Sequence, residues 1–150
     1  MKKILIIYTG GTIGMHHDSS GALKPFDFGK VSEQVPELNR LGCKLSHHGF
    51  SELIDSSNVT PDFWVKLAET IQKNYTKYDG FVILHGTDTM AYSASALSFM
   101  LENLSKPVIF TGSQLPLGAI RTDAKRNLIS SIEIAAGKVL IPEVCIYFNN

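Results

Sequence analysis

The sequence predicts an α/β protein with a three-layer, doubly wound, mainly parallel sheet. Short apolar runs alternate along the chain with longer segments of helical periodicity, a pattern typical of parallel strands joined by right-handed crossovers. The first apolar run, residues 3–8, is continuous, as a strand covered on both faces requires. The length of 150 residues suits one domain with a sizeable core.

The amino-terminal part contains one clear strand, at 3–8, followed by weaker elements. Residues 10–30 are rich in Gly, Ser, His and Asp, and this composition predicts one long loop. Residues 31–40 are predicted as a short helix weakened by Pro36, because proline cannot donate a backbone hydrogen bond. Residues 44–53 are the candidate for a second strand.

The rest of the chain alternates more regularly. Thr60, Pro61 and Asp62 predict a helix start, with a capping hydroxyl, a proline at the first helical position and an acid near the positive dipole end. Apolar residues at helical spacing extend this helix to about Tyr75. The remaining strands are predicted at 80–84, 107–111 and 143–148, and the remaining helices at 90–104 and 123–138.

Composition excludes several classes of protein. Fourteen basic residues balance fourteen acidic ones, which argues against a dedicated partner for nucleic acid or an anionic membrane. Cys43 and Cys145 lie far apart and form no CxxC pair, so they fit a reduced compartment better than a disulfide scaffold. The first apolar run is too short for a secretory segment, and we therefore expect a cytoplasmic protein.

Four hydroxyl-rich loops follow predicted strands, at 9–14, 55–58, 85–89 and 111–114. In an open parallel sheet, ligands bind outside the carboxyl ends of the strands, near the point where the strand order reverses. We therefore expect these four loops to converge on one site.

The first loop does not match a nucleotide-binding pattern, because Thr12 stands where GxGxxG requires its second glycine. A nucleotide-binding module is therefore disfavoured. The Thr12 hydroxyl, in a tight turn beside backbone N–H groups, is a candidate nucleophile with an oxyanion site nearby. The alternative is that this hydroxyl only bonds the backbone of its own turn.

Two other loops offer complementary charges. Thr87 supplies a second hydroxyl, and Asp88 is either an anchor for an ammonium group or a cap of the following helix. Asp55, Ser56 and Ser57 have the composition of an ordinary turn, but they could also face the charged groups of an amino acid.

The histidines give no metal-binding pattern. The pairs 16–17 and 47–48 are adjacent in sequence, and neighbours in an extended chain point to opposite faces. His85 ends a predicted strand and is expected to orient its loop. No histidine is an obvious base for Thr12, so activation of its hydroxyl would need another group, such as a Thr-Asp-Lys relay.

The segments YTGGTIG at 8–14 and HGTDTM at 85–90 resemble the two signatures of bacterial-type L-asparaginases, most nearly the cytoplasmic type I branch. The similarity continues through IDSS at 54–57, ASALSFMLEN at 94–103 and TGSQ at 111–114. It implies a three-layer α/β amino-terminal domain that helps to hydrolyse L-asparagine to L-aspartate and ammonia, with no metal or organic cofactor.

The resemblance also implies roles for individual residues. Thr12 is the matching nucleophile, which forms an acyl-enzyme, and Thr87 and Asp88 match the second hydroxyl and the acid of a Thr-Lys-Asp group. Ser113 matches a position whose backbone carbonyl faces the substrate amide. The positions that match substrate-binding groups are Asp55, Ser56, Ser57, Thr87, Asp88 and Ser113.

Two features depart from the family pattern. The first long loop has no tyrosine after Tyr8, where the family usually places one that closes over the nucleophile. The family lysine and a smaller carboxy-terminal domain would follow Asn150, so residues 1–150 are expected to be a truncated domain with little activity alone. The full-length protein is expected to be a homodimer or homotetramer, since the family completes its site across a dimer.

Two alternatives remain open from the sequence. One is an amidohydrolase for glutamine or a related amide, which differs from asparagine by one methylene. The other is a non-catalytic module that binds an amino acid.

Overall fold

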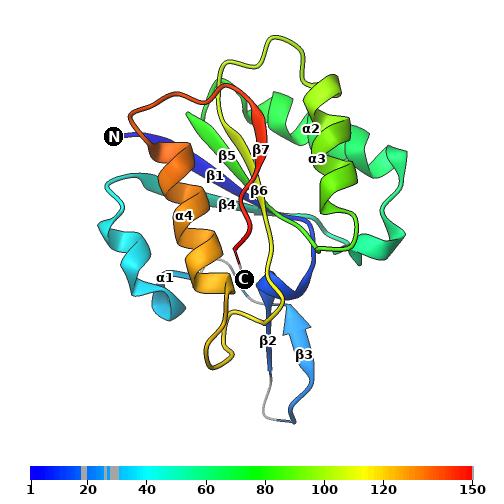
Figure 1. Ribbon diagram of the computed structural model, residues 1–150, viewed down its shortest axis with the longest axis vertical. Coiled ribbons are helices and arrows are strands. Elements are labelled where there is room, and N and C mark those ends of the chain that lie inside the picture. The colour runs from blue at the N-terminus through cyan, green and yellow to red at the C-terminus, as the bar shows by residue number, and fades with distance from the viewer. Residues whose placement is uncertain (18–19, 26, 28–30, 150) are drawn as a thin grey trace.

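The computed structural model describes residues 1–17, 20–25, 27 and 31–149 (Figure 1). Five parallel strands form one sheet in the order β4-β1-β5-β6-β7. Their bounds are Lys3–Tyr8 for β1, Lys44–Gly49 for β4, Gly80–Leu84 for β5, Val108–Thr111 for β6 and Val144–Ile146 for β7. The predicted α/β class with a mainly parallel sheet is confirmed.

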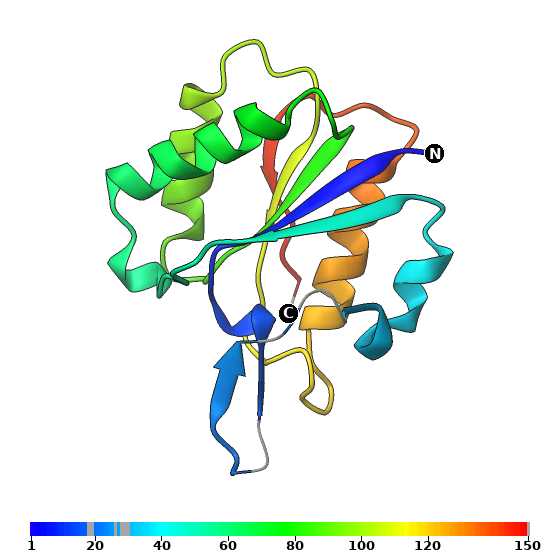
Figure 2. The same ribbon diagram turned by 180° about the vertical axis from the view of Figure 1, so that it is seen from behind.

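The helices cover both faces of this sheet. Helices α1 and α4 lie on one face, and α2 and α3 lie on the other (Figures 1 and 2). Their bounds are Val31–Gln34 for α1, Pro61–Asn74 for α2, Met90–Met100 for α3 and Ala124–Ala136 for α4. The predicted helix at 31–40 is instead two pieces, because the backbone breaks at Val35 before the 3-10 turn Pro36–Arg40.

The sheet has a hydrophobic core on each of its faces, and these two cores explain the continuous apolar run of β1. Ile4 and Ile6 belong to the cluster beneath α1 and α4, whereas Leu5 and Ile7 belong to the cluster beneath α2 and α3. All four side chains are buried. Because successive side chains of a strand alternate between faces, a strand with helices on both sides must be apolar throughout.

One part of the predicted loop at 10–30 is wrong. A short antiparallel hairpin projects from the lower end of the molecule in Figure 1, formed by β2, Met15–His17, and β3, Leu23–Pro25. Three-residue strands among glycines and serines give no period-2 pattern that a sequence reader could detect. Residues 18–19, residue 26 and residues 28–30 of that prediction lie outside the described residues.

The strand order places the reversal point between β1 and β5. From β1 the chain passes outward to β4, and it then crosses back to β5 on the other side of β1. The loops at 9–14 and 85–89 therefore leave neighbouring strands at the position where doubly wound proteins bind their ligands.

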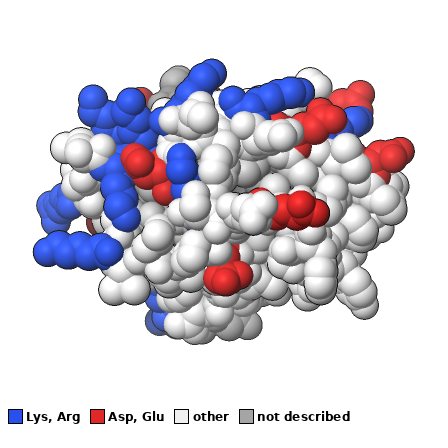
Figure 3. All heavy atoms as spheres, turned by 90° about the horizontal axis from the view of Figure 1, so that it is seen from above, with Lys and Arg blue, Asp and Glu red and all other residues white. Residues whose placement is uncertain are grey.

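The surface carries both signs of charge. Seen from above, Lys and Arg gather toward the left of the molecule, the side of α4, and Asp and Glu lie mainly toward the right (Figure 3). Among the described residues, no helix combines the length and the hydropathy that crossing a membrane would require.

Candidate active site

A cleft of about 420 Å³ opens at the carboxyl ends of β1 and β5. Three segments that are distant in sequence line it, and they supply Thr12, Asp55, Ser56, Thr87 and Asp88. Its other lining residues are Gly10, Gly11, Met15, Leu53, Ile54 and Gly86. The structure thus brings most of the predicted site residues together, while Ser57 and Ser113 lie outside the lining.

Two glycines allow the first loop to approach the others. Gly10 and Gly11 have φ angles of +137° and +85°, which residues with a Cβ atom rarely adopt. A Cβ on Gly11 would lie 2.6 Å from the Cα of Gly86, and one on Gly10 would collide with the carbonyl of Ile54. The close contact places Thr12 beside the loop that carries Thr87.

The Thr12 hydroxyl makes no hydrogen bond with any residue that the structure describes. Thr12 begins the 3-10 turn Thr12–Gly14 and is half-buried. Its neighbour Thr9 behaves differently, because the Thr9 hydroxyl donates a 2.9 Å bond to the carbonyl of Leu84. The interpretation of Thr12 as a residue that only bonds its own turn therefore has no support, and its hydroxyl is left for a ligand.

Tyr8 supports this turn from the end of β1. Its phenol donates a 3.4 Å hydrogen bond to the carbonyl of Gly11, and a Cβ on Gly14 would collide with its ring. Burial raises the pKa of Tyr8 to about 12. The phenol is therefore neutral at physiological pH and acts as a donor.

Asp88 is not a helix cap. Helix α3 begins at Met90 with Thr89 at its N-cap, and no side chain caps it. The Thr89 hydroxyl instead donates a 2.6 Å bond to the carbonyl of Ser56. Asp88 is exposed at the rim of the cleft, where a carboxylate can meet a cationic ligand.

Asp55 is held as a carboxylate by Ser57. Its Oδ1 atom accepts hydrogen bonds from the Ser57 backbone N–H at 3.0 Å and from the Ser57 hydroxyl at 2.9 Å. These bonds, the backbone one first, lower the pKa of Asp55. Ser57 is thus turned toward Asp55, and a contact of Ser57 with substrate stays a prediction.

His85 is at the start of the loop at 85–89 and is 1% exposed. Its Nδ1 lies 2.7 Å from the carbonyl of Gly86, which can only accept, so Nδ1 carries the proton. The Ser93 hydroxyl then donates to Nε2 at 2.9 Å, and Trp64 Nε1 donates to Ser93 at 2.9 Å. Burial lowers the pKa of His85, which therefore contacts the loop as a neutral ring.

The loop after β6 contains the predicted residue Ser113, and it is held by two residues, Asp123 and Asn127, that were not predicted from the sequence. The Ser113 side chain is buried, and its hydroxyl donates a 2.6 Å bond to the carbonyl of Leu115. Asp123 and Asn127 of the α4 region bond the backbone of this loop. A usable signal existed, since Asn127 is a polar residue next to Leu128 on the apolar face of a predicted helix.

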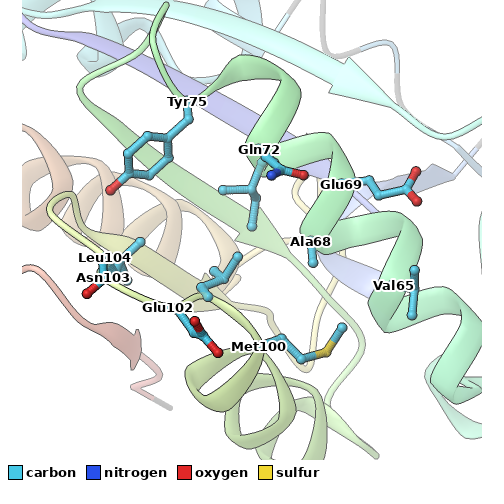
Figure 4. Close-up of a pocket in the computed structure, with 11 residues that line it drawn as sticks. Val65, Ala68, Glu69, Gln72, Tyr75, Met100, Glu102, Asn103 and Leu104 are labelled. Atoms are coloured by element: carbon cyan, nitrogen blue, oxygen red, sulfur yellow. The ribbon is translucent and has the colours of Figure 1, made fainter.

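A larger groove of about 580 Å³ lies elsewhere, between α2 and the segment after α3 (Figure 4). Its lining contains Glu69 and Glu102 beside mainly apolar residues. The hydroxyl of Tyr75, another lining residue, forms hydrogen bonds with Ser105. This groove shares no lining residue with the cleft and contains no threonine or glycine turn. The described residues include no group of three side chains that could hold a metal ion.

Comparisons with known proteins point to one family. The family described as "Asparaginase, N-terminal" matches residues 3–150. "L-asparaginase 1" of Escherichia coli K12 is 50% identical over 99% of the chain, which corresponds to 44% of that protein. The crystal structure of L-asparaginase I from Vibrio cholerae has a TM-score of 0.89 and 50% identity, and the match covers 99% of this chain and 45% of that one.

A relative with a different name matches over the same region. The "60 kDa lysophospholipase" of Mus musculus is 40% identical over 99% of the chain and 30% of that protein. The chain thus spans less than half the length of these relatives.

Proposed function

Because this chain belongs to the asparaginase family, which it matches over an amino-terminal domain, we propose that the protein hydrolyses the side-chain amide of L-asparagine to L-aspartate and ammonia. One observation carries the proposal. A single cleft gathers an unbonded threonine hydroxyl, a second threonine and two carboxylates from three separate loops.

Thr12 is the proposed nucleophile. Its Oγ1 attacks the amide carbon of the substrate, the C–N bond breaks, and ammonia leaves with the proton that the hydroxyl gave up. Water then hydrolyses the resulting ester, which releases aspartate and restores the Thr12 hydroxyl. Thr87 and Asp88 belong to the proton-transfer group, and the resemblance assigns its lysine to a position after residue 150.

The proposed substrate is a zwitterion, which needs partners of both kinds. Asp55 and Asp88 offer carboxylates to its ammonium group, and the Asp55 carboxylate persists because Ser57 lowers its pKa. Ser56 lines the same cleft as the two acids and offers a hydroxyl to the α-carboxylate. The Ser113 carbonyl is the proposed acceptor for the side-chain amide.

The first test is Thr12→Ala in the full-length protein, with ammonia release from L-asparagine as the measurement. Loss of a nucleophile is expected to lower turnover by about 10³-fold or more, while the circular dichroism spectrum is unchanged. Thr60→Ala is the matched control, because Thr60 is exposed and its side chain caps no helix. Turnover that survives Thr12→Ala rejects the nucleophile assignment.

Two other outcomes separate the alternatives. If glutamine exceeds asparagine in kcat/KM, the protein is an amidohydrolase for the longer amide, although one methylene is worth only about 1–3 kcal/mol in a pocket. If calorimetry detects asparagine binding and no ammonia appears, the protein is a binding module.

Location and assembly follow the same proposal. We expect a cytoplasmic protein of the type I branch that assembles as a homodimer or homotetramer. Its binding partner is expected to be a small-molecule substrate. Tyr92 and Phe99 on α3 are 68% and 86% exposed, and such aromatic side chains are common in subunit contacts. Sedimentation of the full-length protein as a monomer would contradict the oligomer.

A further inference from the structure

Two side chains at the start of α4 hold the loop that follows β6. Asn127 Nδ2 donates a 2.9 Å hydrogen bond to the carbonyl of Gly112. The Asp123 carboxylate accepts from the N–H groups of Gln114 and Leu115, at 2.8 Å and 3.0 Å. Both side chains are buried, Asn127 completely. The backbone is therefore fixed on both sides of Ser113.

Ser113 itself is left with only its peptide groups for a ligand. Its hydroxyl is already bonded to the carbonyl of Leu115 at 2.6 Å. No residue in the described part of the chain forms a hydrogen bond with its N–H or carbonyl group. Any contact that Ser113 makes with a substrate therefore runs through its backbone, whose position Asn127 and Asp123 determine.

The fixed loop lies directly against the catalytic cleft. A Cβ added to Gly112 would lie 2.5 Å from the carbonyl oxygen of His85 and 3.6 Å from the Cγ2 of Thr87. Gly112 is thus packed against the strand end that carries Thr87. A shift of Gly112 would move Ser113 relative to the cleft.

Asn127 also reaches the next strand. Its Oδ1 accepts a 3.1 Å hydrogen bond from the N–H of Asn149, just after β7. One side-chain amide therefore joins the segments that leave β6 and β7. The two ends of this amide have different chemistry, a donor toward Gly112 and an acceptor toward Asn149, so they can be altered separately.

We propose that Asn127 is a positioning residue for amide hydrolysis, and that with Asp123 it sets the place of the Ser113 carbonyl. This inference rests on the proposed function. The carbonyl accepts a hydrogen bond from the leaving NH₂ group of the substrate, which orients the amide for attack by Thr12. An ester substrate has no N–H on its leaving atom, so it gains nothing from this acceptor.

The test is Asn127→Asp in the full-length protein, assayed with L-asparagine and with the β-methyl ester of L-aspartate. The substitution keeps the acceptor for Asn149 and replaces the donor to Gly112 with an oxygen. We expect kcat/KM for the amide to fall by about 10- to 100-fold and the ester value to stay within about twofold. A purely structural role would lower both values together.

Two further variants complete the experiment. Asn74→Asp makes the same chemical change on α2, where Asn74 Nδ2 donates to the carbonyl of Thr70 at 2.9 Å, and the amide-to-ester ratio should not change. Asp123→Asn weakens the other anchor of the loop and should shift the ratio in the same direction as Asn127→Asp.

The outcomes separate the two proposals. Equal losses on both substrates in a folded variant, or an unchanged ratio, would overturn the positioning role. If neither variant folds, as judged by circular dichroism, Asn127 and Asp123 serve the fold and the specific role is also overturned. Wild-type protein that releases no ammonia contradicts the proposed function instead.

Discussion

The hydroxyl of Thr89 lies 2.6 Å from the carbonyl oxygen of Ser56 and donates a hydrogen bond to it. This bond joins the loop after β5 to the 3-10 turn Ser56–Asn58, which comes from a different part of the chain. It connects the segment that carries Asp88 to the segment that carries Asp55, and both residues line the cleft. These two residues are the proposed partners of the substrate ammonium group, and the hydrogen bond thus connects the segments that carry them.

Thr89→Val tests this connection, because valine keeps the shape of threonine and removes the donor. The loss of one neutral hydrogen bond is worth about 1 kcal/mol, so we expect KM for asparagine to rise by about fivefold with a smaller change in kcat. Thr89→Ser should retain the wild-type KM. A wild-type KM in Thr89→Val would show that the bond does not set the cleft.

Gly86→Ala tests the closeness of the same two loops. Gly86 does not have a positive φ, so alanine introduces no backbone strain, but its Cβ would lie 2.6 Å from the Cβ of Ser56. Overpacking of this kind is expected to lower the free energy of unfolding by about 1–3 kcal/mol and to weaken substrate binding.

The control for that prediction is Gly118→Ala, since a Cβ at Gly118 would meet no atom within 4 Å. The double variant Gly86→Ala with Ser56→Gly should regain thermal stability, because it removes the colliding side chain. Failure of the double variant to recover any stability would place the cause elsewhere.

Ser57→Ala should raise the pKa of Asp55 toward its ordinary value of 3.8, because the hydroxyl bond is one of two that lower it. A carboxyl with a lowered pKa stabilises the folded state above its ordinary pKa, and this contribution is lost as the pH falls through the folded value. The loss should therefore occur at a higher pH in Ser57→Ala. A ¹³C NMR titration of the carboxyl measures it.

Ser98→Ala is the matched control, because the Ser98 hydroxyl bonds only the carbonyl of Ser95 on α3. The Asp55 titration should be unchanged in this variant. A Ser57→Ala protein with a wild-type titration curve would mean that the backbone N–H alone lowers the pKa.

The buried His85 predicts a pH dependence of stability. Its pKa is lowered by burial from 6.5, so the unfolded chain binds a proton that the folded chain does not. The free energy of unfolding should therefore fall as the pH drops below about 6.5, by at most about 1.4 kcal/mol per pH unit for one group. His85→Gln should lose this component, which urea unfolding at several pH values can measure. Identical slopes for both proteins would contradict the assignment.

The sequence predicted the regular elements well where their pattern is strong. The strand at 80–84 has the predicted bounds, and α2 begins at Pro61 as expected. The Thr60 hydroxyl, however, accepts no capping hydrogen bond from the first turn of the helix, so the proline and the apolar face are enough to place that helix start.

The loops that form the candidate site were predictable from the sequence, but the residues that hold these loops in place were not. Thr12 and Thr87 could be proposed as site residues because hydroxyls follow apolar strands at a known edge of a parallel sheet, and both line the same cleft. The contact between Gly86 and Ser56 could not, since it depends on how two distant loops pack. Asn127 is 15 residues from the carbonyl it binds, and only the folded chain shows that they meet.

The strand order has a consequence for the synthesis of the protein on the ribosome. Strand β1 is made first, but its neighbours β4 and β5 begin only at Lys44 and Gly80. Until the ribosome has released them, five buried positions of β1 have no partner, and an unpaired apolar strand readily joins another chain. The strand that leads into the loop of the proposed nucleophile, Thr12, is therefore exposed to aggregation while the chain is being synthesised.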